Sequence, residues 1–70
     1  MLTPLDRLSA REQQILRLVA QGCANKQIAA ELQPPCSEGT VKVHLKRVYR
    51  ELGVSNRVEA AAMWVRCGGD

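Results

Sequence analysis

The sequence contains no phenylalanine, and Tyr49 and Trp64 are its only aromatic residues. A core without Phe must be built from Leu, Ile, Val and Ala, which suits short helices that pack closely. A chain of 70 residues buries only about 60% of the surface that its unfolded form exposes, so one thin core is expected. The hydrophobic fraction of 46% is too high for a disordered chain. These features predict one all-α domain over residues 1–70.

Cysteine is scarce and poorly placed for cross-links or metals. Cys23, Cys36 and Cys67 are odd in number and widely spaced, which argues against a disulfide framework and favours reduced thiols in a cytosolic protein. No two of them form the Cys-x₂₋₄-Cys pair typical of a zinc site, so we expect no metal and no other cofactor. The longest apolar run, residues 60–65, is too short to cross a bilayer, and no signal peptide is recognisable. We expect a cytoplasmic protein that does not engage a membrane.

Residues for catalysis are equally scarce. His44 is the only histidine, and no Gly-rich phosphate loop is present. General acid–base chemistry needs a partner group beside the histidine, and so short a chain has no core large enough for a substrate cleft. We expect no enzyme, and we place His44 at the border between the buried and exposed faces of its helix.

Positive charge is concentrated in one segment. The net charge is +3, but residues 42–50 hold four cationic side chains and no acidic one. At about 100° per residue, an apolar stripe falls within about 60° of one direction; it contains Val41, Leu45, Val48 and Leu52. A second set lies on the opposite side: Gly39, Lys42, Val43, Lys46 and Arg50. Such a helix is shaped either for a DNA major groove or simply for solvent.

Start and stop signals predict four helices, at about 9–21, 25–32, 37–52 and 56–66. The expected N-caps are Ser9, Asn25, Ser37 and Asn56, and Glu12 completes a capping box with Ser9. Gly22 and Gly53 are expected to end the first and third helices, and Pro34-Pro35 the second. Gly68-Gly69-Asp70 is expected to be a frayed tail.

The expected core faces follow from helical periodicity. The first helix contributes Ile15, Leu16 and Val19, and the second contributes Ile28, Ala29 and Leu32. In the fourth helix the periodic apolar positions are Val58, Ala61, Ala62 and Val65. The short connection between the second and third helices predicts a helix–turn–helix, in which the first helix of the pair braces the second at a steep angle.

Four segments in order resemble one known family, the DNA-binding domain of LuxR-type regulators, also called the FixJ/NarL type. The segments are Leu8-Ser9-Ala10-Arg11-Glu12, Asn25-Lys26-Gln27-Ile28-Ala29, Thr40-Val41-Lys42-Val43-His44-Leu45, and Leu52-Gly53-Val54 followed by residues 56–61. Together they cover residues 8 to about 65, nearly the whole chain.

The resemblance implies a four-helix domain whose third helix enters the DNA major groove. It places Lys42, Val43 and Lys46 on base edges. It also places Thr40, Asn25 and Lys26 on phosphates, and it implies a homodimer formed through the fourth helix on two-fold related DNA sites.

The chain departs from the family pattern in two places. Four residues, Gln33-Pro34-Pro35-Cys36, stand between Leu32 and Ser37, where the family usually has two. The longer turn either bulges outward and leaves the third helix in place, or tilts that helix and weakens groove insertion. Ala24 occupies a position where a capping serine is common, so the cap is either lost or passed to Asn25.

Several candidate residues keep two interpretations. Lys42 and Lys46 either donate to guanine or neutralise phosphates, and Val43 either contacts a thymine methyl or fills space. Thr40 either donates to a phosphate or makes a local bond near the helix start. Arg47 and Arg50, further along the same helix, are expected on phosphates.

The fourth helix leaves similar choices. Arg57 lies in its first turn, where a cation opposes the helix dipole, so the side chain needs a phosphate or a carboxylate such as Glu12. Met63 and Trp64 belong either to the core or, with Ala61 and Val65, to a dimer interface.

We therefore expect a sequence-specific DNA-binding output module of a bacterial transcription regulator, such as a response regulator, with RNA polymerase as a further candidate partner. Two rivals remain. One is a promoter-recognition domain of a sigma factor, against which the Leu52-Gly53-Val54 stop and the fourth helix argue. The other is a helical protein-interaction module that kept this fold and lost DNA binding.

Overall fold

The computed structural model describes residues 3–68, which form four α-helices and one short 3₁₀-helix and contain no strand. The elements are η1 (Pro4–Arg7), α1 (Ala10–Ala20), α2 (Asn25–Glu31), α3 (Glu38–Leu52) and α4 (Arg57–Arg66). The all-α class and the four predicted helices are confirmed. The 3₁₀-helix was not predicted; Thr3 caps it and forms a capping box with Asp6. Residues 69 and 70 of the predicted tail lie outside the described residues.

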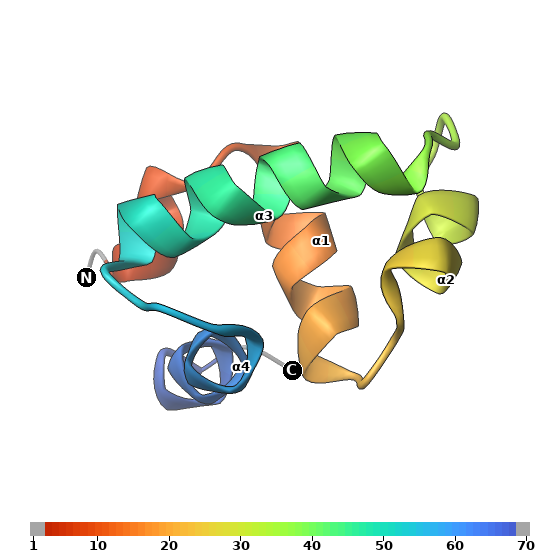
Figure 1. The fold of residues 1–70 in the computed structure, drawn as a ribbon. Helices are drawn as coiled ribbons and strands as arrows, with labels where there is room; N and C mark the ends of the chain where they lie inside the picture. Colours follow the sequence, from red (N-terminus) through yellow and green to blue (C-terminus); the bar gives the residue numbers. More distant parts are fainter. Residues whose placement is uncertain (1–2, 69–70) are drawn as a thin grey trace.

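Helix α1 stands at the centre of the fold (Figure 1), with α3 running across one end and α2 and α4 on either side. The first core cluster joins α1, α2 and α3 through Ile15, Leu18, Val19, Ile28, Ala29, Leu32, Val41 and Leu45. The second joins α1, α3, α4 and the segment after η1 through Leu8, Leu16, Val48, Leu52, Ala60 and Trp64. Half-buried Tyr49 packs against both clusters. The inward faces predicted for the first three helices are confirmed.

Most of the predicted helix ends are also confirmed. The hydroxyls of Ser9 and Ser37 and the amide oxygen of Asn56 each accept from the backbone N–H three residues on. Gly22 and Gly53 adopt φ values of 88° and 70° just after α1 and α3. A β-carbon is strained in this left-handed region, so glycine is the favoured residue at both stops.

The predicted cap at Asn25 is wrong. Asn25 is the first residue of α2, and Ala24 holds the cap position without a side-chain acceptor. Only half of a capping box remains, in which Gln27 Oε1 accepts from the Ala24 N–H at 2.9 Å. The missing acceptor costs about 1 kcal/mol of helix stability.

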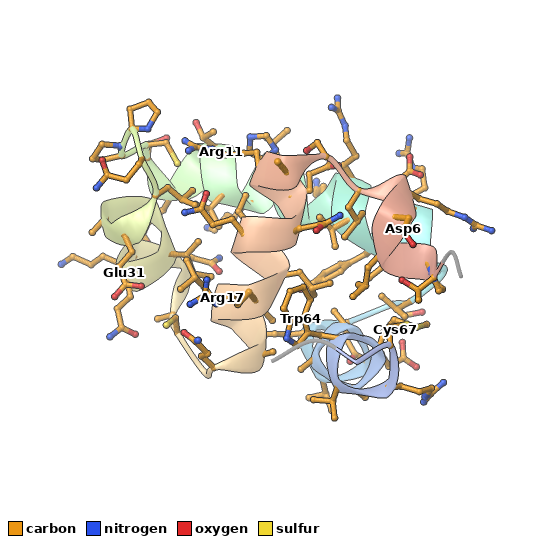
Figure 2. The ribbon with its side chains drawn as sticks, turned by 180° about the vertical axis from the view of Figure 1, so that it is seen from behind. Asp6, Arg11, Arg17, Glu31, Trp64 and Cys67 are labelled. Carbon is orange, nitrogen blue, oxygen red and sulfur yellow. The ribbon has the colours of Figure 1, made fainter. Side chains whose placement is uncertain are left out.

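The predicted inward face of α4 is wrong as well. The helix buries Ala60 and Trp64, which are 0% and 7% exposed, and leaves Val58 and Val65 at 78% and 68%. Figure 2 shows Trp64 in the region where α4 meets α1. Helix α4 is apolar on nearly every side, so periodicity alone selects no face. An indole ring gains far more from burial than a valine, and it therefore decides which face turns inward.

The longer turn after α2 bulges into solvent. Gln33, Pro34 and Pro35 are exposed, whereas Leu32 before them and Val41 after them are fully buried. Cys36 packs against the first core cluster, as a small apolar filler would. The apolar stripe of α3 therefore stays docked on the core despite the two extra residues. No helix in residues 3–68 is long and apolar enough to cross a membrane.

The corrected α4 face can be tested by two truncations on the same helix. Trp64→Ala should lower the free energy of unfolding by about 3–5 kcal/mol, because it empties a core position. Val65→Ala removes exposed atoms and should change it by less than about 0.5 kcal/mol. Urea titration of dilute protein measures both values. Equal losses from the two variants would contradict the assignment.

Candidate nucleic-acid interface

One face of α3 carries the base-contact candidates. Lys42, Val43 and Lys46 are exposed, Val43 by 64%, and they lie opposite the buried stripe of Val41 and Leu45. Arg47 and Arg50 are exposed further along the same helix. The structure thus brings together the α3 cations that the sequence placed on one side, and no acidic residue interrupts them between positions 42 and 50.

Two surface hollows flank this cationic face. The first is lined by Asn25, Lys42, Leu45, Lys46, Tyr49 and Arg57. The second is lined by Val43, Lys46, Arg47 and Arg50. Lys46 borders both hollows. Neither lining contains a carboxylate, and both hollows suit an anionic ligand.

Arg57 makes two intramolecular contacts that the sequence did not indicate. Its Nη1 donates to Asn25 Oδ1 at 2.8 Å, and its Nη2 donates to the carbonyl oxygen of Cys23. It therefore ties the first turn of α4 to the segment that enters α2. Both acceptors are neutral, so the guanidinium keeps its full positive charge at the edge of the first hollow.

Glu12 is not the partner of Arg57. Its side chain is 5% exposed, and its Oε1 accepts from the Ser9 N–H at 3.0 Å in the predicted capping box. The other oxygen, Oε2, is buried and has no hydrogen-bond partner among residues 3–68. Glu12 thus serves the start of α1.

The remaining phosphate candidates lie at helix starts. Lys26 is exposed in the first turn of α2. Thr40 is exposed in the first turn of α3, and its Oγ1 lies 3.1 Å from Ser37 Oγ, which is the local bond considered for it. A hydroxyl can accept from one group and donate to another, so this bond leaves room for a phosphate contact.

The four residues predicted for the dimer interface are not equally accessible. Val65 is exposed, Ala61 and Met63 are half-buried, and Trp64 is buried in the second core cluster. Val58 and Ala62 are exposed and, with Ala61 and Val65, occupy one side of α4 within about 100°. We name these four residues the α4 stripe.

Sequence reasoning missed three contributors near the interface. Leu45 and Tyr49 line the first hollow, although Leu45 was assigned only to the core. Arg11 donates to two backbone carbonyl oxygens in the turn before α3, and nothing in the residue pattern indicated that contact. Within residues 3–68, no three His, Cys, Asp or Glu side chains lie close enough to hold a metal ion.

Comparison with known proteins places the chain beside bacterial transcription regulators. The model of a family described as bacterial regulatory proteins, luxR family, matches residues 6–64. The chain is 49% identical over 61 residues to a nitrate/nitrite response regulator protein homolog of Haemophilus influenzae. This alignment covers 87% of the chain and 28% of that relative.

Two further relatives show the same coverage. Identity is 50% over 62 residues with the probable transcriptional regulatory protein SgaR of Hyphomicrobium methylovorum, covering 89% of the chain and 28% of that protein. Identity is 46% over 61 residues with the nitrate/nitrite response regulator protein NarL of Escherichia coli, covering 87% and 27%. The chain therefore spans little more than a quarter of the length of these relatives.

The Arg57 bonds can be tested through stability. Arg57→Ala should lower the free energy of unfolding by about 1–3 kcal/mol, because a half-buried charged donor is lost from two acceptors. Arg57→Lys should recover only part of this loss, because an ammonium cannot fork to both acceptors. Thermal unfolding at matched salt compares the two variants. Full recovery by lysine would mean that charge, and not the fork, holds α4 to α2.

Proposed function

We propose that this chain, which belongs to the luxR family of bacterial regulatory proteins, reads a specific DNA sequence by placing α3 in the major groove. The observation that carries this proposal is the exposed face of Lys42, Val43 and Lys46 on a helix whose opposite side is fully docked. A docked helix presents these side chains in a fixed arrangement, which direct readout of base edges requires. A module of this kind acts in transcription regulation. We place it in the cytoplasm, with RNA polymerase as a candidate partner.

The proposed roles divide by chemistry. Lys42 and Lys46 donate to guanine O6 and N7, and Val43 contacts a thymine methyl. The side chains around this face contact the phosphates, and the cationic ones supply most of the sequence-independent affinity; they are Asn25, Lys26, Thr40, Arg47, Arg50 and Arg57. Because Asn25 Oδ1 already accepts from Arg57, Asn25 acts mainly by holding that guanidinium beside the first hollow.

We further propose that two copies pair through the α4 stripe on two-fold related half-sites. The support is the apolar surface of Val58 and Val65, separated by nearly two helical turns with Ala61 and Ala62 between them. Small alanines let a second helix approach closely, and the valines supply the area to be buried. Trp64 supports the stripe from beneath, because its ring belongs to the core of its own chain.

Selection from a random duplex library tests the DNA proposal. The parent chain should enrich a two-fold symmetric motif, and the Lys42→Ala/Lys46→Ala variant should lose it. Arg17→Ala/Arg66→Ala is the matched control, since it removes two exposed cations from other helices. Enrichment of one motif by all three proteins would contradict the proposed base contacts. No enrichment by the parent would favour the protein-interaction module, and binding that requires core RNA polymerase would favour the sigma-factor domain.

A single charge tests the dimer proposal. Val65→Glu should leave the fold intact and favour the monomer, because two like charges would meet at the paired stripe. It should weaken binding to a duplex with two half-sites and leave binding to one half-site unchanged. Sedimentation measures whether the variant is a monomer, and titration of each duplex measures its affinity. Ala10→Glu is the control on an exposed position of α1, and equal behaviour of the two variants would exclude the stripe as the interface.

A further inference from the structure

A side chain of α1 fastens the turn that leads into α3. Arg11 Nη1 donates to the carbonyl oxygen of Gln33 at 2.9 Å, and Nη2 donates to that of Pro34 at 2.7 Å. Figure 2 labels Arg11 on the first turn of α1, on the side facing this turn. The two bonds join residues 22 and 23 positions apart in the sequence.

The turn has few other ways to hold its shape. Pro34 and Pro35 have no backbone N–H, so they cannot donate a hydrogen bond. The Cys36 N–H donates to the Ala29 carbonyl at 3.1 Å and closes the loop at its far end. Within residues 3–68, the carbonyl oxygens of Gln33 and Pro34 accept no other hydrogen bond. The guanidinium of Arg11 therefore fixes the middle of the turn.

The position of this turn affects where α3 places Lys42, Val43 and Lys46. Cys36 is followed at once by Ser37, the cap of α3. Lys42 and Val43 come five and six residues later, about 8–9 Å along the helix. A shift of the turn therefore moves the start of α3, and with it the first side chains proposed to meet base edges.

We propose that Arg11 is a positioning residue for DNA recognition, which acts by holding the Gln33–Cys36 turn and thereby the start of α3. The proposal rests on the function proposed above. The planar fork of arginine fits two successive carbonyl oxygens, whereas the ammonium of lysine does not. The fork binds the first two of the four turn residues, Gln33 and Pro34.

Titration of the selected duplex with full-length variants tests this role. Arg11→Ala should bind about 3- to 10-fold more weakly than the parent, because the competent position of α3 is populated for a smaller fraction of time. Arg17→Ala is the matched control, because it removes an exposed cation from the same helix. The salt dependence of binding should keep its slope in Arg11→Ala, whereas loss of a phosphate contact lowers the slope by about 1.

Two further readouts separate positioning from a general loss of stability. The Cys36 amide should exchange its hydrogen faster in Arg11→Ala than in Arg17→Ala, at equal fraction folded. In a chain from which Gln33 and Pro34 are deleted, Arg11→Ala should have no further effect on affinity, because both bonded residues are gone. Arg11→Lys should resemble Arg11→Ala and not the parent.

The results that would overturn the proposal are distinct. Equal affinity of Arg11→Ala and Arg17→Ala excludes any role for the fork. A slope lowered by about 1 makes Arg11 a phosphate contact, and a loss that persists without Gln33 and Pro34 means that Arg11 acts elsewhere. If the parent chain itself selects no duplex, the proposed function has failed, and the exchange of Cys36 still reports whether Arg11 holds the turn.

Discussion

The fold depends on the burial of one short helix on two sides. Helix α1 supplies Ile15 and Val19 to the first core cluster and Leu16 to the second. In a chain of 70 residues, neither cluster has enough apolar area to stand alone. Helices α2, α3 and α4 are therefore parts of one cooperative unit with α1. A substitution that empties either cluster therefore destabilises the helix that carries the cationic face, even when the altered residue lies far from that face.

Two arginines add polar links where this thin core ends. Arg11 joins α1 to the turn before α3, and Arg57 joins α4 to the entrance of α2. Both donate to neutral oxygens of the backbone or of an amide. A carboxylate partner would cancel the charge, whereas these acceptors use the geometry of the guanidinium and leave the charge in place. The same side chains can thus brace the fold and keep the surface attractive to an anion.

The sequence determined much of the fold and less of the site, for identifiable reasons. The stripe from Val41 to Leu52 and the caps at Ser9, Ser37 and Asn56 are local signals, and the structure confirms them. The face of α4 was predicted wrongly because an almost uniformly apolar helix has no unique periodicity. The bonds of Arg11 and Arg57 link residues more than 20 positions apart. No local pattern encodes such contacts, and the base and phosphate roles stay predictions.

The two aromatic residues occupy places that make them useful probes. Tyr49 lines the first hollow beside Lys42 and Lys46, and Trp64 is buried in the second core cluster. With no other Phe, Tyr or Trp in the sequence, the proton NMR signals of each ring can be assigned without labels. The ring protons of Tyr49 report what approaches the cationic face, and the indole N–H of Trp64 reports whether the core is intact. The scarcity of aromatic residues thus gives this protein separate intrinsic reporters of binding and of folding.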